Sequence, residues 1–179
     1  MNSRLIIAVA ATSVVAAQPA YASNKTWDDA STVVAGTLVV AALGMPLVKD
    51  DTKGLEQAAL SVAIGTGTAY GLKSVIHENR PDGSGNDSFP SAHTSMSFAA
   101  AATLQQRYGW DVGIPAAVAA TFVGFARVKA DRHHWYDVLA GAALGTASAV
   151  LLTSPYERRV AVVPYGDTKG GGVSVAMVF

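Results

Sequence analysis

Five long apolar stretches constrain the fold of this 179-residue chain more than any other feature of its sequence. Each stretch is long enough for a helix, and its apolar residues run almost continuously, without the alternation typical of a half-buried strand. They are rich in Ala, Gly and Val, and small side chains let helices approach closely. We therefore predict an all-α helical bundle of about five core helices. The stretches are residues 30–48, 55–72, 92–104, 112–128 and 138–152.

Hydropathy alone leaves open whether this bundle spans a membrane or is soluble. Residues 30–48 are long enough to cross a bilayer, but the second stretch contains Glu56 and Gln57, and the third is short. The placement of charge favours the membrane. If the first stretch enters from outside, five basic residues fall on the cytoplasmic side, as the positive-inside bias expects, and the polar segments 73–89 and 127–137 face the periplasm. The five are Lys49, Lys53, Arg107, Arg158 and Arg159.

The N-terminal segment, residues 1–22, has the pattern of a secretory signal peptide. Arg4 supplies a positive start, residues 5–17 form a short apolar run, and residues 20–22 (Ala-Tyr-Ala) match a small-x-small cleavage site. Cleavage would leave Ser23 first, and the alternative is an uncleaved anchor helix. We predict a protein of the bacterial inner membrane with its active site facing the periplasm, or alternatively a soluble periplasmic protein.

Two further regions follow the signal or anchor segment. Residues 23–155 form the predicted helical domain, and residues 156–179 form a C-terminal tail. In the tail, Val-rich residues 160–163 and 173–179 flank a Gly-rich segment, residues 166–172, which predicts a short β-hairpin. The pattern assigns no task to this tail.

Composition excludes several classes of function. Thirteen Lys and Arg balance thirteen Asp and Glu, and this neutrality argues against a nucleic-acid partner. Half of the residues are hydrophobic and only 15% are charged, which excludes a disordered chain. Because the chain has no cysteine, it contains no disulfide, zinc–thiolate site, iron–sulfur site or thiol nucleophile.

Polar segments at the ends of the apolar stretches carry the residues suited to chemistry. In the first segment, Lys73 and Arg80 are seven positions apart, which on a helix places them on one face about 10.5 Å apart along the axis. Pro81 is predicted to end that helix. Taken alone, basic residues there are more typical of charges that compensate the helix dipole. We interpret His77, which lies between them, as a bystander.

The other two segments add histidines and a carboxylate. Ser91 is placed as the N-cap of an Ala-rich helix, whose free N–H groups would face an anion. His93, with an ordinary pKa of about 6.5, is suited to protonating a leaving group. Asp137 follows His133 by four positions, which predicts that the two are neighbours on one helix face. A carboxylate that orients one imidazole nitrogen leaves the other free to attack. His134 competes for Asp137, and the spacing does not choose between them.

Together these residues predict phosphoryl transfer. Three cationic side chains and a helix N-terminus favour a phosphate-like anion. A histidine backed by an aspartate supplies the nucleophile, and another histidine supplies the acid, so neither a metal nor a cofactor is required. The cationic residues are Lys73, Arg80 and Arg127.

The order and spacing of these motifs resemble the signature of the type 2 phosphatidic acid phosphatase and vanadium haloperoxidase superfamily. The three parts are Lys73-x6-Arg80-Pro81, Pro90-Ser91-Ala92-His93 and Arg127-x5-His133-x3-Asp137. The resemblance implies that His133, rather than His134, forms a phosphohistidine, that Asp137 orients it, and that His93 protonates the leaving oxygen. It also implies five phosphate-binding groups, namely Lys73, Arg80, Ser91, the Ala92 amide and Arg127.

Two positions depart from the usual pattern of that family. Ala92 stands where the family usually has Gly, and Ala126 stands where it usually has Ser before the Arg. Ala92 keeps its backbone N–H, so phosphate binding should survive if its φ is negative. The missing Ser hydroxyl removes one hydrogen bond worth about 0.5–1.5 kcal/mol. We therefore expect reduced or altered activity and not an inactive site.

We predict a metal-independent phosphatase that hydrolyses phosphate esters of envelope lipids, with a phosphorylated lipid as its partner. The alternatives are a soluble periplasmic acid phosphatase acting on small phosphomonoesters, a vanadate-dependent haloperoxidase, and a membrane scaffold that only binds lipid headgroups. The family's haloperoxidases are generally much larger, and the short loop 81–89 leaves little room for an added cofactor environment. The choice of lipid, the choice between hydrolysis and transfer, and the oligomeric state stay open.

Overall fold

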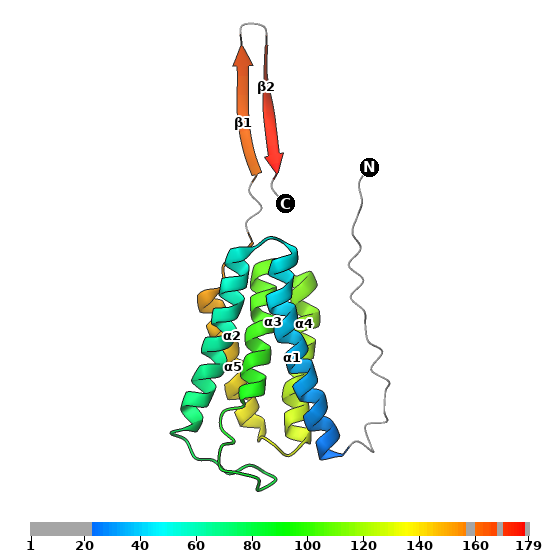
Figure 1. Ribbon diagram of the computed structural model, residues 1–179, viewed down its shortest axis with the longest axis vertical. Helices are drawn as coiled ribbons and strands as arrows, with labels where there is room; N and C mark the ends of the chain where they lie inside the picture. Colours follow the sequence, from blue (N-terminus) through cyan, green and yellow to red (C-terminus); the bar gives the residue numbers. More distant parts are fainter. Residues whose placement is uncertain (1–22, 157–159, 168–169, 178–179) are drawn as a thin grey trace.

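The computed structural model describes residues 23–156, 160–167 and 170–177. Within them, five helices form an elongated bundle that is followed by two strands (Figure 1). The prediction of an all-α bundle with five core helices is confirmed. The predicted signal or anchor segment, residues 1–22, lies outside the described residues. The elements are α1 (Asn24–Val48), α2 (Thr52–Lys73), α3 (Ala92–Tyr108), α4 (Trp110–Lys129), α5 (Trp135–Leu152), β1 (Val160–Asp167) and β2 (Gly170–Met177).

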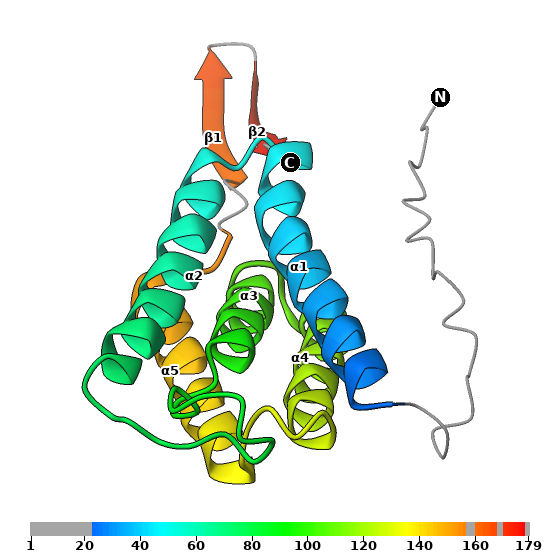
Figure 2. The ribbon, with the colours of Figure 1, turned by 60° about the horizontal axis from the view of Figure 1, so that its bottom comes forward.

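Helix α3 lies at the centre of the bundle and contacts each of the other four helices (Figure 2). Its contact with α5 requires glycine at two positions. A Cβ atom at Gly141 would lie 2.4 Å from the carbonyl oxygen of Ser91, and one at Gly145 would lie 2.1 Å from that of Ser95. The small residues that predicted close helix packing therefore bring the middle of α5 directly against the start of α3.

Helix α2 ends earlier than predicted. It stops at Lys73, and the chain continues irregularly past Arg80, so the prediction of one helix running to Pro81 was wrong. The Ser74 hydroxyl donates to the carbonyl of Gly71 at 2.7 Å, a side-chain bond of the kind that competes with the helical pattern. The Lys73 ammonium also donates to the carbonyl of Ser88 at 3.0 Å, which draws the following loop back under the helix.

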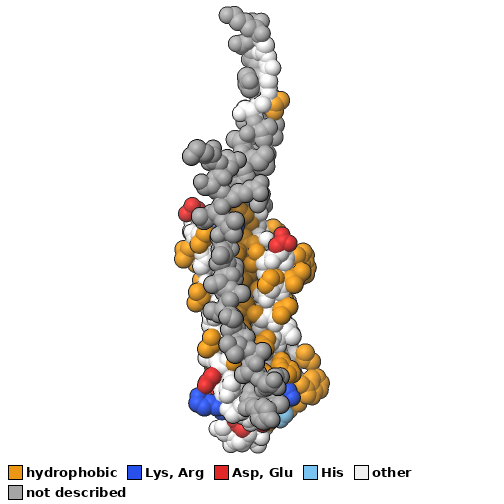
Figure 3. Space-filling model, turned by 90° about the vertical axis from the view of Figure 1, so that its right-hand side faces the viewer, with side chains coloured by type: hydrophobic (Ala, Val, Ile, Leu, Met, Phe, Trp, Pro, Cys, Tyr) orange, Lys and Arg blue, Asp and Glu red, His pale blue; other side chains and the backbone are white. Residues whose placement is uncertain are grey.

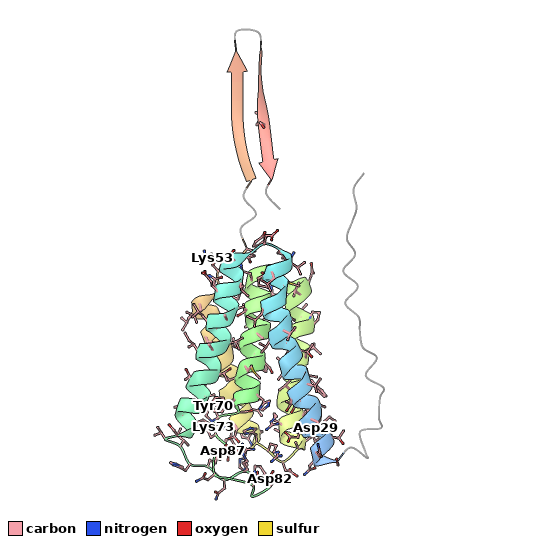
Figure 4. All side chains as sticks on the ribbon, in the orientation of Figure 1. Asp29, Lys53, Tyr70, Lys73, Asp82 and Asp87 are labelled. Carbon is pink, nitrogen blue, oxygen red and sulfur yellow. The ribbon has the colours of Figure 1, made fainter. Side chains whose placement is uncertain are left out.

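Among the described residues, three helices, α1, α4 and α5, are long and apolar enough to cross a membrane. Hydrophobic side chains cover the length of the bundle, and charged side chains gather toward its two ends (Figure 3). Figure 4 shows Lys53 at one end and Lys73, Asp82 and Asp87 at the other. The predicted separation of basic residues from the polar segments is thus confirmed for Lys53, while Arg158 and Arg159 lie outside the described residues.

The predicted C-terminal hairpin is confirmed, and its strands are longer than expected. β1 and β2 pair antiparallel, with Val160 opposite Met177 and Asp167 opposite Gly170. The pairing includes Gly166 and Gly172, which the sequence had placed in the turn. The hairpin extends beyond the end of the bundle where α1 ends and α2 begins (Figure 1).

Candidate active site

A pocket of about 430 Å³ opens at the end of the bundle where α2 and α4 end and α3 begins. Six of the eight predicted site residues line this pocket, namely Lys73, Arg80, Ala92, His93, Arg127 and His133. The remaining two, Ser91 and Asp137, are fully buried. The Ser91 N–H donates to the carbonyl oxygen of Asp137 at 3.0 Å, which links them to each other beside their pocket-lining neighbours. The structure therefore brings together residues from three segments that are distant in sequence.

The paired histidine and aspartate stand at the start of α5. His133 precedes the helix, so the two residues do not share a helix face as predicted, and the turn before Trp135 brings them together instead. His133 Nδ1 lies 3.4 Å from Asp137 Oδ2, which leaves Nε2 as the free ring nitrogen. Burial lowers the pKa of His133 below its ordinary value, although its interaction with Asp137 opposes the shift. A neutral imidazole at neutral pH is the form that attacks phosphorus.

Two donors hold the Asp137 carboxylate in place. The Ser88 hydroxyl donates to Oδ2 at 2.5 Å, and the backbone N–H of His134 donates to the same atom at 2.8 Å. Ser88 is itself fully buried. Sequence reasoning missed Ser88, although it lies only three residues before Ser91 in the second motif.

The geometry separates the two candidate histidines. His134 Nδ1 lies 3.5 Å from Asp137 Oδ2, almost as close as His133 does, but His134 is not among the residues that line the pocket. Its ring stacks on Tyr136, with ring centroids 5.0 Å apart. The pocket therefore favours His133 as the histidine that meets a substrate.

The start of α3 has the predicted cap. Ser91 Oγ accepts a hydrogen bond from the Thr94 N–H at 3.4 Å. Among the described non-glycine residues, only Asp50 and Asp131 have positive φ, so Ala92 has the negative φ that its substitution for glycine requires. His93 follows on the first turn, where its Nε2 lies 3.4 Å from Thr32 Oγ1 of α1. Burial, with Arg127 nearby, lowers the pKa of His93 to about 4.

Carboxylates that sequence reasoning missed pair with the cationic residues. Arg80 binds Asp87 in a bidentate pair, with N–O distances of 2.8 and 3.0 Å. Arg127 donates to Asp28 of α1, and Arg132 donates to the same carboxylate at 2.9 Å. Asp28 is 99 positions from Arg127, and no local pattern connects them.

The pocket keeps an excess of positive charge. Its lining contains Lys73, Arg80, Arg127 and Arg132 against two carboxylates, which leaves a formal charge of +2 with neutral histidines. The Arg127 Nε atom is buried and has no hydrogen-bond partner within the part of the chain that the structure describes. A buried donor without a partner is rare in folded proteins. This atom and the positive excess suit the pocket to a phosphate dianion.

Comparison with known proteins agrees with the resemblance seen in the motifs. Residues 54–161 match the family model of the PAP2 superfamily. The chain belongs to the PAP2 superfamily. Helix α1 lies outside the matched residues, although it supplies Asp28 and Thr32 to the pocket.

Two similar proteins are lipid A phosphatases. The chain is 36% identical over 97 residues to the lipid A 1-phosphatase of Porphyromonas gingivalis, which covers 52% of this chain and 22% of that protein. It is 30% identical over 122 residues to the lipid A 4'-phosphatase of Helicobacter pylori, which covers 62% of each. The matched region thus spans less than two thirds of the length of either relative.

Two crystal structures share the architecture. LpxE of Aquifex aeolicus superposes with a TM-score of 0.61 at 21% identity, over 72% of this chain and 83% of that one. The first transmembrane PAP2 type phosphatidylglycerolphosphate phosphatase from Bacillus subtilis superposes with a TM-score of 0.51 at 25% identity, over 72% and 74%. With its three apolar helices, this PAP2 chain is a membrane protein.

Proposed function

We propose that the protein is a membrane phosphatase that hydrolyses a phosphate ester of an envelope lipid through a phosphohistidine on His133. One observation carries the proposal: a buried imidazole, backed by Asp137, lines a cationic pocket together with a second histidine. The similarity to two lipid A phosphatases supports a phosphorylated lipid as the substrate. The apolar outer faces of α1, α4 and α5 argue against the soluble acid phosphatase, and no observation favours a haloperoxidase.

In the first step of this mechanism, His133 Nε2 attacks phosphorus and the bond to the lipid oxygen breaks. Arg80, Arg127 and Lys73 hold the equatorial phosphate oxygens with the amides at the start of α3, where the transition state carries its charge. The Asp137 carboxylate stabilises the imidazolium that forms. His93 gives its proton to the leaving lipid oxygen, and a phosphate dianion beside it raises its pKa from about 4 and so favours the protonated form.

In the second step, water attacks the phosphohistidine. His93, now neutral, accepts a proton from that water, and inorganic phosphate leaves as the bond to His133 breaks. The protons therefore balance over one turnover, because His93 loses one in the first step and regains one in the second. Apart from the substrate and water, both steps use only side chains and backbone amides of this chain.

We place the protein in the bacterial inner membrane, with the pocket facing the periplasm. Lys49 and Lys53 lie at the junction of α1 and α2, at the opposite end of the bundle, and we assign this end to the cytoplasm because the cations of the pocket end serve the proposed phosphate site. Labelling of single cysteines by a membrane-impermeant thiol reagent in intact spheroplasts tests this orientation. His77→Cys, at an exposed position at the pocket end, should react, and Lys53→Cys, exposed at the opposite end, should not.

The direct test is phosphate release by the purified protein in detergent with EDTA present. Substrates are lipid A, phosphatidylglycerolphosphate, phosphatidic acid and a soluble aryl phosphate. We expect release from a lipid substrate, and a loss of about 10³-fold or more in His133→Asn because the nucleophile is gone. His77→Asn is the matched control, since His77 is exposed and outside the pocket. Full turnover by His133→Asn, or loss of wild-type activity with EDTA, would contradict the mechanism.

A further inference from the structure

The guanidinium of Arg80 is bound by a carboxylate inside the pocket. Its Nε donates to Asp87 Oδ1 at 2.8 Å and its Nη2 donates to Oδ2 at 3.0 Å, and both residues line the pocket. Two parallel N–H···O bonds of this kind are also the way in which an arginine binds a phosphate group. A phosphate group that binds Arg80 through the same two nitrogen atoms therefore has to replace the Asp87 carboxylate.

Arg127 differs from Arg80 in this respect. It pairs with Asp28, but its buried Nε atom has no hydrogen-bond partner among the residues that the structure describes. Arg127 can therefore bind a phosphate oxygen without giving up its carboxylate, whereas the Nε and Nη2 atoms of Arg80 are both bonded to Asp87. Competition between a carboxylate and phosphate is thus expected at Arg80.

The charge of Asp87 opposes phosphate whichever nitrogen atoms of Arg80 the phosphate meets. Hydrogen bonds from Arg80 lower the pKa of Asp87, so the carboxylate is ionised at neutral pH. A phosphate group on Nη1, which takes part in neither bond with Asp87, would still lie next to this negative charge. Asp87 therefore lowers the affinity of the pocket for phosphate, and inorganic phosphate is the product of the proposed reaction.

The backbone of Asp87 is held in place independently of its side chain. The carbonyl oxygen of Asp87 accepts a hydrogen bond from the Lys73 ammonium, and Figure 4 shows the two residues at the same end of the bundle. The next residue, Ser88, donates its N–H to the carbonyl of Glu78 at 2.9 Å. The Asp87 side chain can therefore turn about its own bonds while the loop keeps its position.

Exposure shows that the pair is not needed to hold the fold together. The side chains of Asp87 and Arg80 are 51% and 19% exposed, whereas those of Asp51 and Arg107, the ion pair at the other end of the bundle, are 4% and 5% exposed. An exposed ion pair contributes little to stability, because water solvates and screens its charges. Asp87 can therefore leave Arg80 for solvent at a small cost in free energy.

We propose that Asp87 is a product-release residue of this site. Its carboxylate binds Arg80 when no phosphate group is bound, turns towards solvent when the phosphate group of the substrate binds, and returns to Arg80 as inorganic phosphate leaves. No covalent bond forms or breaks in this exchange. The role in product release rests on the proposed phosphatase function, whereas the competition between Asp87 and phosphate does not.

The binding test titrates the full-length protein in detergent with inorganic phosphate at neutral pH in a calorimeter. We expect Asp87→Asn to bind phosphate at least about fivefold more tightly than the wild type, which is the effect of one unit charge about 4 Å away even in the dielectric of water. Asp87→Glu keeps the charge and should bind phosphate as weakly as the wild type does. Asp29→Asn is the matched control, because Asp29 is an exposed carboxylate at the same end of the bundle and does not line the pocket.

Three results of this test would overturn the inference. Unchanged phosphate affinity in Asp87→Asn would show that the carboxylate does not compete. Weaker binding would show instead that Asp87 orients Arg80 towards phosphate. Equally tight binding in Asp29→Asn would show that any lost negative charge at this end has the same effect. Chemical unfolding of Asp87→Asn should match that of the wild type, and a clear loss of stability would assign the pair a structural role.

The turnover test measures hydrolysis of a lipid substrate in the presence of increasing inorganic phosphate. In Asp87→Asn we expect the half-inhibiting phosphate concentration to fall at least about fivefold, with a lower KM and no rise in kcat. Equal product inhibition in the wild type and the variant, with turnover intact, would overturn the role in product release and leave the phosphatase function standing. If no substrate were hydrolysed at all, the proposed phosphatase function would fail, while calorimetry would still decide whether Asp87 competes with phosphate.

Discussion

Each end of the bundle holds a buried arginine paired with an aspartate, but the two arginines differ in what their remaining donors meet. At the end away from the proposed active site, Arg107 pairs with Asp51, and its third nitrogen donates to the carbonyls of Ser154 at 2.8 Å and Pro155 at 3.0 Å. At the other end, Arg127 pairs with Asp28 but leaves Nε without a partner in the described part of the chain.

Burial and cavity size do not separate these two ends. The side chains of Arg107 and Arg127 are 5% and 4% exposed. A cavity of about 360 Å³ lies beside Arg107, close in size to the one beside Arg127, but no histidine lines it. The difference shows that the role of a buried arginine depends on whether each of its N–H donors has a hydrogen-bond acceptor. A saturated guanidinium holds the fold together, and an unsaturated one beside histidines is available to an anion.

The largest effect is expected at the saturated end. Arg107→Met leaves the Asp51 carboxylate buried without its cation, which should lower the free energy of unfolding by about 3–5 kcal/mol. Chemical unfolding in detergent measures this change. The double variant Arg107→Met with Asp51→Asn removes the unpaired charge but keeps a cap for α2, and should recover part of the loss. Wild-type stability in the single variant would contradict the structural role of this pair.

A smaller free-energy change, seen in turnover and not in folding, is expected at the other end. Arg127→Gln should lower turnover roughly 10²–10³-fold, equivalent to about 2.7–4 kcal/mol of lost transition-state stabilisation. Its stability should change less than that of Arg107→Met, because Asp28 keeps Arg132 as a partner at 2.9 Å. Phosphate release and unfolding are measured on the same preparation. If Arg127→Gln unfolded as readily as Arg107→Met, the distinction between the two ends would disappear.

The smallest effect is a pH dependence confined to the end that carries the histidines. In the free enzyme the mechanism needs His133 neutral and His93 protonated, and burial holds the pKa of His133 below its ordinary value and that of His93 at about 4. Above both values, the protonated fraction of His93 falls about tenfold per pH unit while neutral His133 stays constant. We therefore expect kcat/KM to decline as pH rises above about 6.5.

His93→Gln isolates the cause of that decline. This variant should be slow at every pH and should lose the part of the alkaline decline that His93 supplies. Wild-type and variant profiles measured with one substrate share the ionisation of the substrate itself, so their ratio reports on the enzyme. A ratio that stays constant with pH would exclude His93 as the acid.

Much of the fold was predictable because the signals are local. Near-continuous apolar stretches of helical length predicted all five helices, and Ser91 before an Ala-rich run predicted the cap of α3. The Val-rich segments of the tail predicted its hairpin. Where local signals competed, the prediction was less accurate. Pro81 appeared to end α2, but Ser74 and the reach of Lys73 to Ser88 end it earlier.

The residues of the site were predictable, but the contacts that hold them in place were not. The eight motif residues meet at one end of the bundle, but Arg80 and His133 reach the pocket from loops and not from helices. Asp28 could not be found, because its partner is 99 positions away and an acidic residue near the start of a helix is common. Ser88 needed the structure as well, since its role depends on the orientation of one buried hydroxyl.

The contribution of α1 bears on what the smallest working unit of this protein is. The segment that matches the family model begins at residue 54, yet the counter-ion of Arg127 and the hydroxyl beside His93 both come from a helix that is complete before that point. A fragment trimmed to the matched residues would retain every motif residue and still lack the side of the pocket that α1 supplies. To transfer this chemistry to another scaffold, α1 therefore has to be transferred as well, although it contains none of the motif residues.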